Sequence, residues 1–329
     1  MIGFDLHHPR PATFPAPVAH VPATGIRSLL AAMRASVRAF WDEATGYQRL
    51  AYLVGAALMV VGLAHAAIWM VVGGSAEGAL SWRKPMTFGL SFGLTTATLA
   101  WVGGHLPVGR RIGWVVSAAL CASTTLEVAW VVLQHARGVA SHFNDATPLD
   151  ETLFVGGGVT IGVTLVVVVL MTLASFVRTS APPAMALALR AGLVSLLVAM
   201  AVGGWMIING NELLDADVSP LTQSMTTYGA AGVMKLAHAV PMHGIQFFGV
   251  LAWLLTFSGL PARRRLSLVA LAVAGFAGLF GVVLMRTVSG LAPFTPMDAS
   301  LGVYLAPIGL LATAGSVTLA AVWRHARGI

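Results

Sequence analysis

Long apolar segments alternate with short polar connections along almost the whole chain. Eight segments follow one another, and each holds roughly the 20 apolar residues that a helix needs to cross a bilayer core. The segments are residues 48–73, 86–104, 112–136, 152–178, 187–209, 229–257, 266–286 and 304–323. We therefore predict an all-α polytopic integral membrane bundle of about eight transmembrane helices. Glycines are expected to let these helices approach closely, namely Gly55, Gly62, Gly89, Gly93, Gly229 and Gly232.

The residues before the first span divide into two parts. Residues 1–25 contain five prolines and are predicted to form a disordered tail. Residues 26–46 carry apolar side chains at helical spacing with arginines on the other side, which predicts an amphipathic helix. Such a helix either lies in the headgroup plane beside anionic lipid or is a solvated linker. Residues 47–329 then form one transmembrane domain.

The composition agrees with a chain whose solvent is mostly lipid. Of 329 residues, 57% are hydrophobic and only 9% are charged, against about 25% charged in an ordinary soluble domain. The net charge of +7 follows from membrane topology, so nucleic acid is not an expected partner. The single cysteine, Cys121, excludes an intrachain disulfide. No signal-peptide core precedes the first span, which is therefore expected to anchor the chain.

The charges of the connections predict the orientation. Cytoplasmic loops are rich in Lys and Arg, and 14 of the 19 basic residues fall in both tails and every second connection. The remaining connections carry eight of the 12 acidic residues. We expect a multi-pass protein of a plasma or inner membrane with both termini in the cytoplasm. The 14 basic residues are Arg10, Arg27, Arg34, Arg38, Arg49, Arg110, Arg111, Arg178, Arg190, Arg263, Arg264, Arg265, Arg324 and Arg327.

Several spans contain ionisable side chains, each of which costs about 2.5–3.5 kcal/mol to insert. A rise of about 1.5 Å per residue gives their depth. On this scale His65, Glu127 and His238 lie roughly 8, 5 and 8 Å to the non-cytoplasmic side of the midplane. We predict that these three side chains, from three different spans, approach within about 10 Å and share one ion.

The third span presents a polar face to the rest of the bundle. Glu127, Trp130, Gln134 and Arg137 follow one another at spacings of three and four, so they share one side of a helix. Exposure of this side to lipid would be costly, which predicts that it points inward. The face is either a structural hydrogen-bond network or part of a site that continues through His142 and Asn144.

The sixth span combines polar residues with a predicted break. Pro241 removes a backbone donor and kinks the helix, which membranes tolerate where the break faces protein or a polar cavity. Lys235 and His238 share one face, and His243 and Gln246 share another. His238 and His243 are five residues apart, so they are not the usual pair at a spacing of four. The kink could turn His243 towards the predicted ion site, or each histidine is simply hydrogen-bonded.

Basic residues also lie where the topology disfavours them. Arg83 and Lys84 precede Pro85 at the non-cytoplasmic start of the second span, and the start of a helix is a favourable place for an anion. The alternative is that both side chains reach for lipid headgroups. Asn209 and Arg286 end two other spans on the same side.

Three functions are compatible with these residues. The first is a membrane-embedded enzyme, for example an oxidoreductase, with a transition metal (Zn, Fe or Cu) or haem b bound by histidines and Glu127 and with a lipid-like or anionic substrate. The second is a proton-coupled transporter that uses the broken sixth span, and the third is an accessory subunit with a purely structural polar network. The candidate metal or cofactor ligands are His65, Glu127, His142, His238 and His243; the candidate catalytic residues are Glu127, Lys235 and Arg137; and the candidate substrate-binding residues are Arg83, Lys84, Gln134, Asn144, Asn209 and Gln246.

Overall fold

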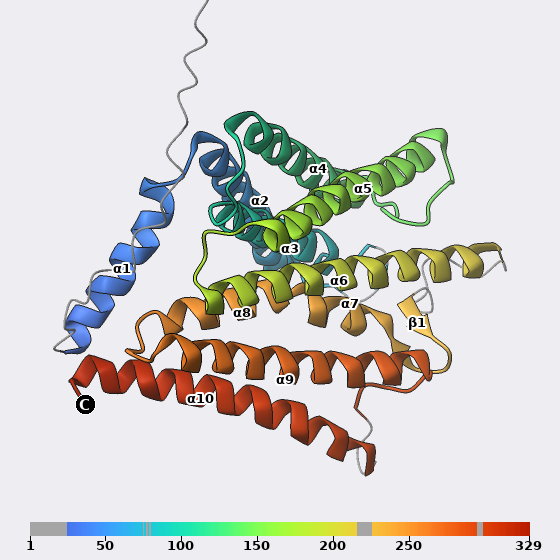
Figure 1. The fold of residues 1–329 in the computed structure, drawn as a ribbon. Coiled ribbons are helices and arrows are strands. Elements are labelled where there is room, and N and C mark those ends of the chain that lie inside the picture. The colour runs from blue at the N-terminus through green and yellow to red at the C-terminus, as the bar shows by residue number, and fades with distance from the viewer. Residues whose placement is uncertain (1–24, 75, 77, 79, 216–225, 295–298) are drawn as a thin grey trace, which may run out of the picture.

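The computed structural model describes residues 25–329 except 75, 77, 79, 216–225 and 295–298 (Figure 1). Most of the predicted proline-rich tail therefore lies outside the described residues. Most of the described residues are helical and very few are in strands, which confirms the all-α prediction. The helices are α1 (Ile26–Asp42), α2 (Gly46–Val72), α3 (Arg83–Gly103), α4 (Arg110–Ala136), α5 (Pro148–Val177), α6 (Pro183–Asp215), α7 (Met234–Met242), α8 (Gly244–Leu255), α9 (Ala262–Val288) and α10 (Leu305–Arg327).

Seven helical segments are long and apolar enough to cross a membrane, with α7 and α8 counted as one. The helix that falls short is α3, in which Gly and Thr lower the mean hydropathy. Its 21 residues still span about 32 Å at 1.5 Å per residue. The backbone N–H of Gly25 donates to the carbonyl of Ala326 over 2.8 Å, so α1 begins where α10 ends. Both therefore lie at one end of the bundle. The chain between them must cross the bundle an even number of times, so α3 is counted with the other seven segments to give eight crossings.

The two ends of the bundle differ in charge. We call the end that holds α1 and the last turn of α10 the basic end, and the other the acidic end. The basic end is the one predicted to be cytoplasmic.

The helices form two groups, visible in Figure 1 as an upper and a lower set. In the first group α2 packs against α3 and α4, and α4 packs against α5; in the second, α6 packs against α7, α8 and α9, and α9 packs against α10. The contact of α5 with α6 joins the groups. The largest cluster of buried apolar side chains, which includes Leu99, Val168, Leu193 and Phe248, lies between them.

Glycines allow α2 and α3 to pack closely against each other. A Cβ atom on Gly89 would lie 2.6 Å from the backbone nitrogen of Gly62, and one on Gly55 would lie 2.7 Å from the carbonyl oxygen of Gly93. Only glycine allows this approach, as predicted.

The predicted sixth span begins too early, because residues 227–233 form a hairpin instead. Its strands are β1 (Thr227–Tyr228) and β2 (Gly232–Val233), which pair antiparallel.

The predicted break in the sixth span is confirmed. Helix α7 ends at Met242 and α8 begins at Gly244, with Pro241 in the last turn of α7. The Ser195 hydroxyl of α6 donates to the carbonyl of Pro241 over 2.6 Å. A Cβ on Gly244 would meet that same hydroxyl at 2.4 Å. The break is thus packed tightly against α6.

The predicted amphipathic helix is α1, and it connects the two groups at the basic end. Trp253 of α8 donates its indole N–H to the Ser36 hydroxyl over 2.9 Å. Phe40 meets Trp101 of α3 edge to face at 6.0 Å between ring centres. One short helix therefore contacts α3, α8 and α10.

Candidate functional site

Glu127 is the buried carboxylate of the fourth helix. Its side chain points into the bundle, and the residue is only 3% exposed. The hydroxyl of Thr160 on α5 donates to its Oε2 atom over 2.8 Å. Gly157 on α5 leaves space for the carboxylate, because a Cβ there would lie 3.3 Å from Oε2. The prediction that this face of the third span points inward is confirmed for Glu127, and for Gln134, which is 1% exposed.

His142 approaches Glu127 from the connection between α4 and α5. Its Nε2 atom lies 4.0 Å from Oε1 of the carboxylate, slightly beyond hydrogen-bond distance. Burial holds the pKa of His142 well below its usual value, and the positive charge of Lys84 lowers that pKa further. The imidazole is therefore neutral near pH 7. Aromatic rings surround it, with Phe88 at 5.5 Å and Phe154 at 6.3 Å between ring centres.

Two lysines complete this arrangement, and they are the only lysines among the 19 basic residues of the chain. Lys84 is the second residue of α3 and Lys235 the second residue of α7. Lys84 interacts electrostatically with both Lys235 and Glu127. The structure thus brings together residues predicted as substrate-binding, catalytic and metal-ligating. We call Lys84, Glu127, His142 and Lys235 the charged cluster.

The charged cluster lies near the acidic end and draws on both groups of helices. Lys84 and Glu127 belong to the first group, whereas Lys235 begins α7 in the second. Both lysines lie in the first turn of a helix, where the helix dipole adds positive potential. This part of the molecule is therefore suited to an anion.

A second polar network surrounds Asp150 in the first turn of α5, where the residue is 2% exposed. Arg137 contacts its Oδ1 atom at 2.5 Å, and Gln134 donates to the same atom over 2.8 Å. Thr147 donates to Oδ2 over 2.6 Å. Arg137 also donates to the side-chain carbonyl of Gln134. This network joins the end of α4 to the start of α5, so Arg137 and Gln134 have structural partners.

The connection between α4 and α5 is anchored on α6. Phe143 adopts a positive φ of 54°, which is strained for an aromatic residue. Its ring packs onto Gly210, where a Cβ would come within 2.3 Å of the ring. Asn144 donates to the carbonyl of Ala140 over 2.9 Å and shapes the loop. Asn209 lies next to Gly210 near the end of α6.

His65 does not reach the charged cluster. Its Nδ1 atom lies 2.8 Å from the carbonyl of Val61 in its own helix, and its ring is 6.1 Å from that of Trp82. Trp82 also contacts His135, at 4.3 Å between ring centres. Next to Trp82, Arg83 donates to the carbonyl of Ala76 over 2.7 Å.

The histidines of the broken span are also elsewhere. His238 lies against α6, with Nδ1 2.7 Å from the carbonyl of Ala199 and its ring over Gly203. His243 is exposed on the outside of the bundle, so the break does not turn it inward. Gln246 lies 3.5 Å from Thr98 of α3, and its side-chain oxygen is buried with no hydrogen-bond partner among the described residues.

The predicted ion site of His65, Glu127 and His238 is therefore not formed. Across the described ranges, no three His, Cys, Asp or Glu side chains are grouped so that they could hold a metal ion. The reason lies in helix order: α2 packs against α3 and α4, whereas α7 packs against α6 and α9. Equal depth does not bring residues together when their helices are not neighbours.

Four residues of the cluster's surroundings were not predicted from the sequence. Gly157 is the middle residue of a run of three glycines in an otherwise apolar span, which is a signal for close helix contact, and Thr160 follows that run by two residues. Asp150 follows Thr147 by three residues, the spacing of a helix N-cap. His135 carried no signal, since it is one of several polar residues at the end of the third span.

Comparison with protein-family models, with curated proteins and with solved structures finds no match to this chain.

Proposed function

We propose that this chain is a proton-coupled transporter for a small anionic solute, which binds between Lys84 and Lys235. The observation that carries the proposal is the electrostatic interaction of Lys84 with both Lys235 and the buried carboxylate of Glu127. Two like charges in partly buried positions repel each other, and an anion between them removes that repulsion.

The charge balance of the cluster supports an anionic ligand. Lys84 and Lys235 contribute two positive charges, Glu127 contributes one negative charge, and the partly buried imidazole of His142 is neutral. Counted over these four side chains alone, the sum is +1 while Glu127 is ionised and +2 once it is protonated. Protonation of Glu127 therefore strengthens the attraction for an anion, which couples proton binding to solute binding.

Glu127 and His142 are suited to exchange that proton. Their side chains are 4.0 Å apart, so a movement of about 1 Å would bring them into hydrogen-bond distance. His142 belongs to a connection that reaches the acidic end of the bundle. A proton can thus pass from the imidazole to the carboxylate without crossing lipid.

The position of the cluster also fits transport. Transporter sites commonly lie between two bundles and beside a discontinuous helix. Here the four residues come from both helix groups, and Lys235 begins the broken sixth span. At the other end, α1 contacts α3, α8 and α10, which is the arrangement expected of a state closed at the basic end.

Flux measurements in proteoliposomes test the proposal. The vesicles contain pyranine, and inward gradients of succinate, inorganic phosphate or methanesulfonate supply carboxylate, phosphate and sulfonate chemistry. We expect at least one of these anions to acidify the lumen, and we expect Glu127→Gln to abolish that signal. If none of the three exceeds the Glu127→Gln vesicles, the proposal is wrong.

Thr164→Val provides a matched control for loss of packing. Thr164 shares a hydrogen bond of 2.9 Å with Ser123 at the same α4–α5 interface, without contact to the cluster. This variant should retain flux. The metal- or haem-enzyme hypothesis stays a prediction, and elemental analysis with a visible spectrum of the purified protein would test it.

A further inference from the structure

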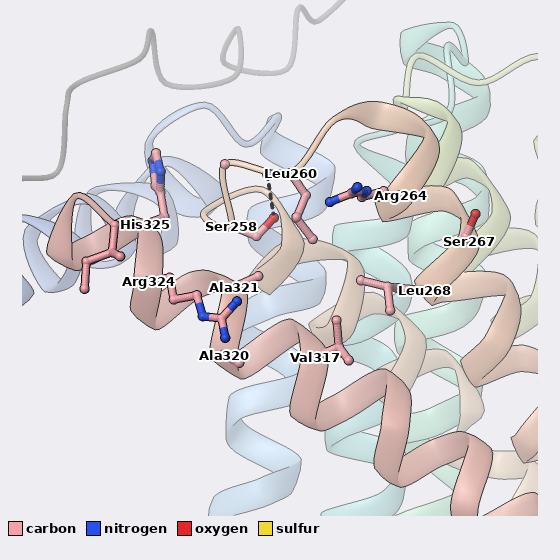
Figure 2. Close-up of a pocket in the computed structure, with 12 residues that line it drawn as sticks. Ser258, Leu260, Arg264, Ser267, Leu268, Val317, Ala320, Ala321, Arg324 and His325 are labelled. Carbon is pink, nitrogen blue, oxygen red and sulfur yellow. Dashed lines mark hydrogen bonds between the residues drawn. The ribbon is translucent and has the colours of Figure 1, made fainter.

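A cavity of about 580 Å³ opens at the basic end, far from the charged cluster. It lies between the start of α9, the last turns of α10 and the turn that joins α8 to α9 (Figure 2). Its volume is in the usual range of ligand sites.

The upper part of this cavity is basic. Arg264 projects from the first turn of α9 and Arg324 from the last turn of α10, whereas the ring of His325 is turned away from both (Figure 2). No acidic residue is among the residues that line it. Neither guanidinium has an ion-pair partner in the part of the chain that the structure describes. Two unpaired guanidinium groups at helix ends form a favourable place for a phosphate.

The lower part is apolar and extends along both helices. Leu268 of α9 and Val317 and Ala321 of α10 line it. Val317 precedes Arg324 by seven residues, which is about 10 Å deeper at 1.5 Å per residue. A free phosphate ion has no apolar surface to bury against this wall. The first part of a lipid acyl chain does, and the wall is long enough for it.

The charged part lies at headgroup depth. Trp323 is exposed next to Arg324, and tryptophans gather at the membrane–water interface. Arg327 stacks over its ring at 3.8 Å. The cavity therefore has guanidinium groups at the level of lipid phosphates and an apolar wall at the level of lipid tails.

We propose that this cavity binds an anionic phospholipid, with its phosphate between Arg264 and Arg324 and one acyl chain along Val317 and Leu268. Basic pockets between transmembrane helices recognise anionic headgroups in this way. Because the lipid contacts α9, α10 and the α8–α9 turn, it would stabilise the second helix group. The proposal does not depend on the transport function.

Thermal unfolding of the delipidated full chain in dodecylmaltoside tests the proposal. We expect phosphatidylglycerol in mixed micelles to raise the unfolding temperature. Phosphatidylcholine and free glycerol 3-phosphate should not, because the first lacks net charge and the second lacks acyl chains. Equal stabilisation by glycerol 3-phosphate would overturn the lipid assignment in favour of a phosphate site.

Variants locate the effect. Arg264→Gln and Arg324→Gln should each raise the phosphatidylglycerol concentration for half-maximal stabilisation by about tenfold. Arg263→Gln removes an equal charge from the exposed neighbour and should behave as the unaltered protein. Ala321→Phe fills the apolar part and should weaken the lipid effect while every charge remains. Equal loss in Arg263→Gln, or no loss in the other three variants, would refute the proposal.

Discussion

Thr160 on α5 donates a hydrogen bond of 2.8 Å to the Glu127 carboxylate on α4. This bond fixes one oxygen of the carboxylate and leaves the other facing His142. A charge-assisted bond in a buried place is worth about 1.5–3 kcal/mol. The proton affinity of Glu127 therefore depends on its neighbour in the next helix.

Thr160→Val should make Glu127 easier to protonate, because the ionised form loses a donor. We expect the pH dependence of anion flux in proteoliposomes to shift towards higher pH. Thr164→Val, which removes a hydroxyl one turn along the same interface, should leave the pH profile in place. Identical profiles for the two variants would show that Thr160 acts only through packing.

Each lysine of the cluster should contribute to anion binding. Lys84→Gln and Lys235→Gln are expected to raise the half-saturating anion concentration by about tenfold each. Arg83→Gln is the control, because Arg83 is adjacent in sequence and bonds to the carbonyl of Ala76 instead. An effect of Arg83→Gln as large as that of Lys84→Gln would indicate a diffuse surface charge and not a site.

The network around Asp150 should be structural. Asp150→Asn leaves Arg137 without its carboxylate, and we expect a loss of about 1–3 kcal/mol in stability, measured as a lower unfolding temperature. The affinity of folded protein for the anion should not change. Asp145→Asn, an exposed acid in the same connection, should have no effect on either quantity. A change in anion affinity without a change in stability would contradict this assignment.

The neutral imidazoles predict acid sensitivity. His142 has a pKa well below its usual value through burial and the charge of Lys84, and burial lowers the pKa of His105 to about 4. Both groups bind protons more readily in the unfolded chain, near pH 6.5. Their contribution to stability is therefore complete above about pH 6.5 and is lost as the pH falls towards the folded pKa values.

Unfolding temperatures measured from pH 8 to pH 4.5 test this expectation. His142→Gln should flatten the curve in part, with the contribution of His105 remaining. The exposed His243 provides a control, since His243→Gln should leave the slope unchanged. A curve for His142→Gln that is parallel to the unaltered one would contradict the argument.

The orientation also stays a prediction. Single cysteines at positions 145 and 264, in a Cys121→Ala background, would be treated with an impermeant maleimide on intact cells. Only the cysteine at position 145 should react, because the basic end is predicted to be cytoplasmic. Preferential reaction of the cysteine at position 264 would show that the protein has the opposite orientation in the membrane.

Most of the fold could be predicted from the sequence, whereas the site could be predicted only in part. Hydropathy located the spans to within a few residues, except where the hairpin of residues 227–233 replaced helix. Helical spacing also oriented Glu127 and Gln134 correctly, because a polar face cannot be exposed to lipid. The depth argument failed for His65 and His238, since depth carries no information on which helices are neighbours. The electrostatic interaction of Lys84 with Lys235 likewise depends on how the helices pack, so it could not be predicted from the sequence.

The two lysines offer the most direct test of the central claim, because amine-reactive reagents can modify few other positions in this chain. Purified protein carrying Arg263→Lys as a reference lysine would be treated with sulfo-NHS-acetate, with and without the transported anion, and modification quantified by peptide mass spectrometry. If the anion binds between Lys84 and Lys235, it should slow the acetylation of both lysines and leave the acetylation rate of the lysine at position 263 unchanged. Equal acetylation rates with and without the anion at all three positions would contradict it.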